Sequence, residues 1–259
     1  MFDTHCHFNL DEFKSELDSV IERSIKLGVD RFLVPGIDKS TSENSLALET
    51  LYSDQIYSAV GIHPGYSSQA DPDEIEELLK TEHTRVSAIG EIGLDYFRDY
   101  SPRTKQLATL KSMFSLAIQY QLPIILHNRK ADDDLIKKLD AWYVSSAEYN
   151  GQGGIFHAFD GSEKILCWGM DHHFLFGIGG MVTYKKNDVL REKIRRIGLE
   201  HLVLETDSPY LTPVPQRGKR NSPENLHYVV DAIADILAID KDIVIKKTHE
   251  NAMRIFGLL

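Results

Sequence analysis

The sequence predicts an α/β protein with the TIM (β/α)8 barrel fold. Short apolar segments alternate with amphipathic segments along the whole chain, and eight of each kind can be counted. Strict alternation of strands and helices predicts a parallel sheet, and eight such units favour a closed barrel over an open sheet. The strands are expected near residues 1–5, Arg31–Pro35, Tyr57–Ile62, Val86–Ile92, Pro123–His127, Gly154–His157, Phe174–Ile178 and His201–Thr206.

The helices lie between these strands, and several carry signals for a helix end. Gly28 follows the first helix, while Ser101-Pro102 and Ser222-Pro223 precede the fourth and the eighth. A further helix is expected in the tail from Asp240 to Leu259, packed on the outside of the barrel. The eight helices are expected near 11–27, 40–52, 72–80, 102–120, 131–146, 162–170, 187–197 and 223–238.

The length and composition fit one globular domain over residues 1–259. The chain has 42% hydrophobic and 26% charged residues, without an internal repeat or a long linker. A net charge of −10 argues against a protein that coats nucleic acid through a broad basic surface, although a local cationic site remains compatible with it. With two cysteines and no apolar run of about 20 residues, we expect a cytoplasmic monomer that needs no membrane and no obligate protein partner.

The N-terminal segment holds the first candidate metal ligands. His5 and His7 lie one strand period apart, so both project from one face while Cys6 points away as a small buried residue. A pair of this kind can equally be part of a surface strand or a hydrogen-bonded core. Recurrence favours a metal site, because further candidate ligands stand at the ends of other predicted strands. These are Glu91, His127, His157 and Asp207.

Four imidazoles and two carboxylates exceed what one tetrahedral ion needs. They predict two divalent cations, with Glu91 as the bridging ligand and the flanking Gly90 and Gly93 leaving room for close approach. Two adjacent cations predict hydrolysis by a metal-bridging hydroxide. Asp207 could bind one cation and also accept the proton of the water, so Glu91 and Asp207 are the expected catalytic residues. Zinc, manganese and magnesium all remain open as the metal.

Basic residues close to these ligands indicate an anionic substrate. Arg217, Lys219 and Arg220 follow the strand that leads to Asp207, and Arg129 follows His127 by two residues. Arginine binds phosphate oxygens in a bidentate manner, so phosphate is the expected ligand. The alternative is a loop whose arginines pair with surface acids.

Other polar and aromatic residues near the predicted site have open roles. His63 is expected at the same rim, where it binds a substrate phosphate or a ligand carboxylate, or is simply a neutral hydrogen-bonded histidine. Glu205 is expected to point inward below Asp207 in a structural role, and Asp95 to support a ligand. Tyr96 and Phe97 could stack a base, although packing beneath a loop is the commoner use of such rings.

Six sequence blocks together resemble the signature blocks of the TatD family. They span nearly the whole chain, in the family's order: Phe2-Asp3-Thr4-His5-Cys6-His7, Gly61-Ile62-His63-Pro64, Gly90-Glu91-Ile92-Gly93-Leu94-Asp95, His127-Asn128-Arg129, His157-Ala158-Phe159-Asp160-Gly161 and Glu205-Thr206-Asp207-Ser208-Pro209-Tyr210-Leu211. The resemblance implies a metal-dependent hydrolase on a TIM barrel, with deoxyribonuclease activity in several members. It also implies that His5, His7, Glu91 and Asp207 hold one metal, and Glu91, His127 and His157 the other.

The chain departs from the family pattern at Ser222, Ala158 and Asp160. These departures leave the metal ligands in place but bear on substrate preference. The leading hypothesis is therefore a dinuclear phosphodiesterase whose substrate is DNA or a small phosphodiester. The alternatives are hydrolysis of a small amide, lactone or phosphoester, and a metal-binding scaffold without catalysis.

Overall fold

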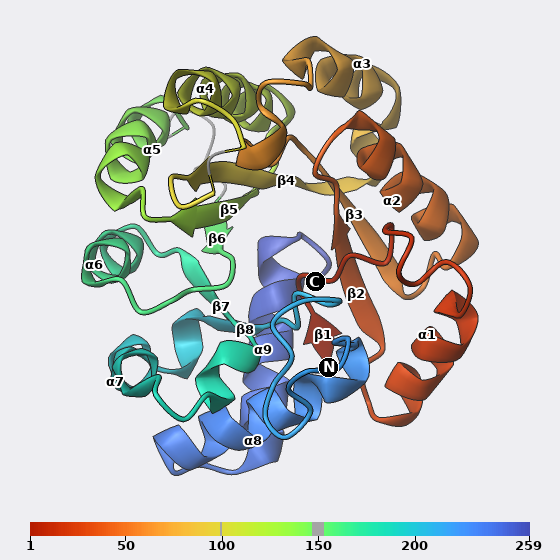
Figure 1. The fold of residues 1–259 in the computed structure, drawn as a ribbon, viewed down its shortest axis with the longest axis vertical. Helices are drawn as coiled ribbons and strands as arrows, with labels where there is room; N and C mark the ends of the chain where they lie inside the picture. The colour runs from red at the N-terminus through yellow and green to blue at the C-terminus, as the bar shows by residue number, and fades with distance from the viewer. Residues whose placement is uncertain (99, 147–152) are drawn as a thin grey trace.

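A computed structural model describes residues 1–98, 100–146 and 153–259, and it confirms the α/β TIM barrel. One eight-stranded sheet has its strands in chain order, and each strand from β1 to β8 pairs with the next in parallel. The strands stand around a common centre with helices outside them (Figure 1). They are β1 (Phe2–Asp3), β2 (Arg31–Pro35), β3 (Ile56–Val60), β4 (Val86–Asp95), β5 (Ile124–Arg129), β6 (Gly154–Phe156), β7 (Leu175–Ile178) and β8 (Leu202–Leu204).

Backbone hydrogen bonds beyond the named strands join the two ends of the sheet. The Thr4 amide donates to the Leu204 carbonyl at 2.9 Å, and the Asp207 amide donates to the His5 carbonyl at 2.9 Å. An isolated parallel bridge pairs Cys6 with Ser208. The segment after β1 and the segment after β8 are therefore neighbours, which places His5 and Asp207 at the same mouth.

The helices fall close to the predicted positions, and short 3-10 turns lie between some of the elements. The first helix begins later than expected, at Leu17, because residues 11–16 form turns instead. The α-helices are α1 (Leu17–Lys26), α2 (Lys39–Leu51), α3 (Pro72–Glu82), α4 (Arg103–Tyr120), α5 (Asp132–Ser146), α6 (Glu163–Asp171), α7 (Asp188–Ile197), α8 (Leu226–Leu237) and α9 (Lys241–Ile255). The 3-10 turns are η1 (Pro64–Tyr66), η2 (His83–Arg85), η4 (Gly180–Thr183), η5 (Leu199–His201) and η6 (Pro223–Asn225).

The barrel interior is filled by one apolar side chain from each strand. Because side chains alternate along a strand, Leu33 points inward while Phe32 and Val34 join the outer core beneath the helices. The inward layer is therefore a packed core below the mouth. Its members are Phe2, Leu33, Ala59, Ala88, Ile125, Ile155, Leu175 and Val203.

The tail helix closes the opposite end of the barrel. We expected it to pack on the outer wall, but Ala252 and Phe256 of α9 belong to the inward apolar layer, with the Phe256 and Phe2 ring centroids 5.6 Å apart. Asn251 fixes the helix by donating to the carbonyls of Leu199 and Leu202, at the start of β8. Viewed as in Figure 1, α9 crosses the middle of the ring of strands. The candidate ligands lie at the other mouth, at the carboxyl ends of the strands.

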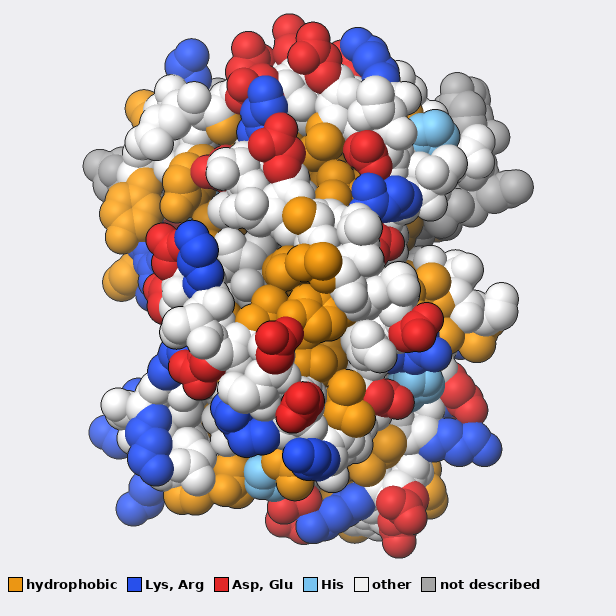
Figure 2. Space-filling view, turned by 90° about the vertical axis from the view of Figure 1, so that its right-hand side faces the viewer, with side chains coloured by type: hydrophobic (Ala, Val, Ile, Leu, Met, Phe, Trp, Pro, Cys, Tyr) orange, Lys and Arg blue, Asp and Glu red, His pale blue; other side chains and the backbone are white. Residues whose placement is uncertain are grey.

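The outer surface on one flank carries charges of both signs. Figure 2 shows the side formed by α1, α2 and α3, where acidic and basic side chains are interspersed around a central hydrophobic strip. Among the residues described there, basic side chains do not gather into a continuous surface, in keeping with the net charge of −10. Within the described ranges, no helix combines the length and the apolar character needed to cross a membrane.

Candidate metal centre

Glu91 lies within β4, and two glycines beside it allow β4 to approach its neighbour closely. A Cβ on Gly90 would lie 2.6 Å from the Cβ of Ile125, and a Cβ on Gly93 would lie 1.9 Å from the carbonyl oxygen of His127. Gly93 also has a φ of +145°, which disfavours a side chain. The glycines thus bring β4 against β5, and this contact sets the Glu91 carboxylate beside His127.

His5 and His7 converge on Asp207 from the other side of the mouth. Their Nε2 atoms are 3.2 Å apart. The Oδ1 atom of Asp207 lies 3.9 Å from Nε2 of His5 and 3.4 Å from Nε2 of His7. Oε2 of Glu91 lies 3.3 Å from Nε2 of His5. Four ligand-type atoms therefore face one small space, and these residues form the first group.

A second group joins the other oxygen of Glu91. Oε1 lies 2.9 Å from Nδ1 of His127 and 3.7 Å from Nε2 of His63. The ring of His127 is also held from behind, because its Nε2 lies 3.2 Å from Oδ2 of Asp95. Glu91 thus forms one cluster with His63 and His127, and its other oxygen faces the first group. The sequence expectation for Asp95, a supporting partner of a ligand, matches this contact.

His157 lies between the groups and closer to the first. Its ring stacks on that of His5 with centroids 3.4 Å apart. Its Nε2 is 3.6 Å from Oδ1 of Asp207 and 3.9 Å from Oε1 of Glu91. Its Nδ1 meets Oε2 of Glu205 at 3.1 Å. The six expected ligands therefore meet at one mouth, together with His63.

The electrostatics keep both carboxylates ionised. Burial alone would raise the pKa of Glu91, but the imidazoles of His63 and His5 hold that pKa well below its ordinary value. Burial would likewise raise the pKa of Asp207, and His157 lowers it instead. Burial lowers the pKa of His157, but Glu205 and Asp207 raise it to about 10. The pocket therefore favours positive charge beside its two anions.

The donor set fits divalent cations. Imidazole nitrogens and carboxylate oxygens face shared spaces. At these distances their lone pairs repel one another unless a cation or a proton lies between them. The Nδ1 atoms of His5 and His7 are buried without a hydrogen-bond partner among the described residues. Both rings are therefore oriented by packing, with the Nε2 atoms left to serve the site.

Some of the basic residues predicted to bind substrate form ion pairs or hydrogen bonds within the protein, and others do not. Arg220 pairs with Oε1 of Glu16 at 2.9 Å and donates to the Glu12 carbonyl, and Lys219 donates to Gln216 at 2.9 Å. Arg220 therefore matches the alternative of a surface ion pair, because its guanidinium is already occupied. Arg129 and Arg217 form no ion pair with the described residues, and each lies over an aromatic ring.

The adjacent aromatic residues Tyr96 and Phe97 differ in their surroundings. The Tyr96 hydroxyl donates to Oδ2 of Asp134 at 2.7 Å, and its ring lies against Arg103. Phe97 is 62% exposed. Tyr96 thus packs into the structure, and only Phe97 offers a ring to the solvent.

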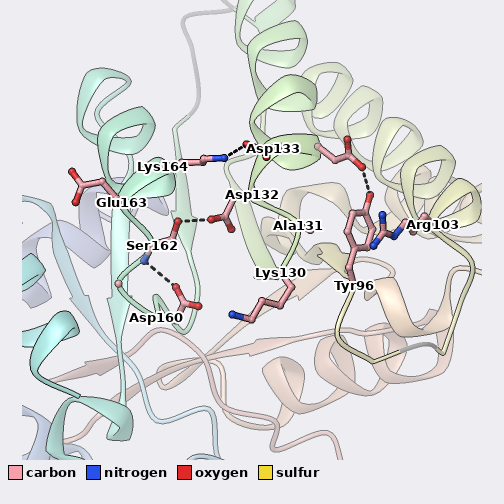
Figure 3. Close-up of a pocket in the computed structure, with 12 residues that line it drawn as sticks. Tyr96, Arg103, Lys130, Ala131, Asp132, Asp133, Asp160, Ser162, Glu163 and Lys164 are labelled. Carbon is pink, nitrogen blue, oxygen red and sulfur yellow. Dashed lines mark hydrogen bonds and ion pairs between the residues drawn. The ribbon is translucent and has the colours of Figure 1, made fainter. Parts of the chain in front are cut away.

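A cavity of about 680 Å³ lies beside the mouth, among the loops before α5 and α6. Figure 3 shows the Lys130 side chain directed into it. The carboxylates around the cavity are engaged: Asp132 accepts from Ser162 at 2.6 Å, and Asp133 pairs with Lys164. Sequence reasoning did not find this cavity, because its walls come from separate βα units.

Comparisons with known proteins cover the whole chain. The model of a family described as TatD related DNase matches residues 2–257. The uncharacterized metal-dependent hydrolase YabD of Bacillus subtilis is 38% identical over 261 residues, which span 100% of this chain and 99% of the relative. The 3'-5' ssDNA/RNA exonuclease TatD of Salmonella typhimurium is 31% identical over 266 residues, with 100% of each chain covered. The crystal structure of YjjV, a TatD homologue from Escherichia coli K12, has a TM-score of 0.92 at 28% identity and covers 100% of this chain and 98% of its own.

Proposed function

The chain belongs to the TatD family of metal-dependent hydrolases, as the sequence blocks indicated, and on that premise we propose that it hydrolyses phosphodiester bonds of DNA with two divalent cations. One observation carries the proposal: Glu91 stands between two clusters of imidazoles at the mouth of the barrel, with one oxygen toward each. The name of the relative from Salmonella typhimurium, a nuclease, supports nucleic acid as the substrate.

We assign His5, His7, Glu91 and Asp207 to one cation, and Glu91, His127 and His157 to the other. The close approach of the first group supports its assignment. The stacking of His157 on His5 and the contact of His63 with Glu91 make His63 an additional candidate for the second cation. When bound, two adjacent divalent cations lower the pKa of water and neutralise the charge that builds up on the phosphate oxygens.

The residues of the chain supply orientation and proton transfer. Asp207 is ionised beside three imidazoles, so its carboxylate can accept the proton of the attacking water. Glu205 holds His157 through Nδ1, and Asp95 holds His127. Arg129 and Arg217 are free to orient the phosphate. We do not assign Arg220 this role, because Glu16 already neutralises it.

The decisive test compares metal-replete protein with Glu91→Gln on end-labelled single- and double-stranded DNA. We expect cleavage by the unmodified protein, and at least a 100-fold loss in the variant, on the order of what removal of one transition-state contact costs. Glu22→Gln, at an exposed position on α1 away from the mouth, is the matched control.

The same preparations are assayed on a small phosphodiester, a lactone and a cyclic amide. Turnover of an amide or lactone without DNA cleavage would favour the alternative hydrolase, and binding of metal without turnover of any substrate would favour the scaffold. Full cleavage by purified Glu91→Gln would contradict the role assigned to Glu91.

A further inference from the structure

Two arginines near the mouth have no carboxylate partner in the described part of the chain, although the protein is acidic. The chain has 39 acidic and 29 basic residues, and several arginines elsewhere pair with a carboxylate. Arg23, Arg191 and Arg196 do so, at N–O distances of 2.7 Å. Arg129 and Arg217 form neither an ion pair nor a hydrogen bond through their side chains within the described ranges, although carboxylates are plentiful. Their charges are therefore available to a ligand.

Each free arginine is held in place by an aromatic ring. The guanidinium carbon of Arg129 lies 4.0 Å from the ring centroid of Phe97, and that of Arg217 lies 4.1 Å from the ring centroid of Tyr184. Stacking fixes the plane of a guanidinium group without neutralising its charge. The two pairs are therefore preformed cationic platforms.

The two platforms present different faces to the solvent. Phe97 is 62% exposed while Arg129 is half-buried, so the ring is the outer member of the first pair. Tyr184 is half-buried and donates its hydroxyl to the Thr212 carbonyl, while Arg217 is exposed, so the guanidinium is the outer member of the second pair. A planar group can stack on either outer face.

The platforms lie at different parts of the barrel mouth. Phe97 and Arg129 belong to the ends of β4 and β5, whereas Tyr184 and Arg217 follow β7 and β8, with β6 between the two pairs (Figure 1). The candidate metal ligands project into the mouth between them. A ligand that reaches both platforms therefore extends past several strand ends of the mouth, which a mononucleotide-sized molecule at one platform does not do.

We propose that Phe97–Arg129 and Tyr184–Arg217 hold single-stranded polynucleotide at two places along the mouth of the candidate metal centre, with one base stacked on Phe97 and another on Arg217. This proposal rests on the proposed function and adds the residues that bind the bases of the substrate. Unpaired bases stack on aromatic rings and on guanidinium planes, and the arginine charge attracts the flanking phosphates. Bases inside a duplex cannot reach these faces.

The test measures the affinity of metal-replete protein for a fluorescent phosphorothioate oligothymidylate, which keeps its charge and resists hydrolysis. Phe97→Ala is expected to raise the Kd roughly 5- to 150-fold without changing its dependence on salt. Arg217→Met is expected to raise the Kd and to reduce the slope of log affinity against log salt by about 0.7. Phe97→Trp enlarges the ring and is expected to lower the Kd, a gain that misfolding cannot produce.

Leu51→Ala on α2 and Arg195→Met on α7, both exposed and outside the mouth, are the matched controls and should bind as the unmodified protein does. The proposal is overturned if Phe97→Ala and Arg217→Met bind within twofold of the unmodified protein, if a blunt duplex binds as tightly as the single strand, or if the unmodified protein binds no oligonucleotide. Hydrolysis of bis(4-nitrophenyl) phosphate by the unmodified protein tests the proposed function independently, since so small a diester does not need the platforms.

Discussion

Glu205 is a buried carboxylate beneath the candidate metal centre, and it contacts a candidate ligand. One oxygen meets Nδ1 of His157 at 3.1 Å, and the other accepts from the Ala158 amide at 2.7 Å. A Cβ on Gly177 would lie 2.1 Å from Oε2 of Glu205, so the glycine in β7 makes the space that the carboxylate fills. Hydrogen bonds of this kind set the tautomer and the plane of a metal-binding imidazole.

Replacing Glu205 with glutamine is therefore expected to weaken metal binding or activity by about 10- to 100-fold, the usual range for such partners of metal ligands. The amide keeps the shape but removes the negative charge that supports His157. Bound metal is measured by mass spectrometry after dialysis, and turnover is measured on the same samples. Unchanged metal content and turnover, with Glu22→Gln as the control, would show that His157 needs no such support.

Arg220 shows the limit of sequence reasoning for a single residue. Its neighbours Arg217 and Lys219 made the whole loop look free to bind phosphate. Its partner Glu16 lies 204 positions earlier and reaches it only because the loop after β8 folds back against the segment before α1. Pairing between distant surface charges depends on packing, which a local pattern of basic residues does not encode.

The helix α9 has a structural role in the barrel. It closes the barrel at the end opposite the metal centre, with Phe256 packed on Phe2 and next to the inward layer. The apolar positions of the tail predicted a helix, and that prediction is confirmed. The expectation that the helix would cover the outer wall was wrong, because the outer wall and the open end are both apolar and the sequence pattern does not distinguish them.

Phe256→Ala is expected to lower the free energy of unfolding by about 3 kcal/mol, because a large ring is removed from a nearly closed apolar layer. Leu259→Ala, at a side chain that is 84% exposed, should leave stability nearly unchanged. Urea unfolding followed by circular dichroism measures both. Equal urea midpoints for the two variants would indicate that the packing of Phe256 contributes little to the stability of the protein.

Metal binding is expected to stabilise the whole molecule, because the candidate ligands come from both ends of the chain. His5 and Asp207 are about 200 residues apart and meet only in the folded state. A cation that binds this state alone should raise the free energy of unfolding by about 2.7 kcal/mol at 100 times its Kd.

The measurement is thermal unfolding of chelator-treated protein with and without added zinc, manganese or magnesium. As one domain, the protein should unfold in a single transition that moves to higher temperature with metal. The shift should shrink in Glu91→Gln, which disturbs both groups, while Glu22→Gln should retain it. An unfolding temperature that none of the three metals changes would count against a cation site at this mouth.

The sequence by itself determined the alternation of strands and helices, the barrel and the family, because apolar periodicity and short motifs are local properties. It also placed His5, His7, Glu91, His127, His157 and Asp207 at the carboxyl ends of strands, where the barrel brings them together. Only the tertiary structure decided which atoms face one another: His63 beside Glu91, Arg220 paired with Glu16, and Arg129 and Arg217 stacked and unpaired. These contacts depend on side-chain packing between distant segments, and no local pattern specifies them.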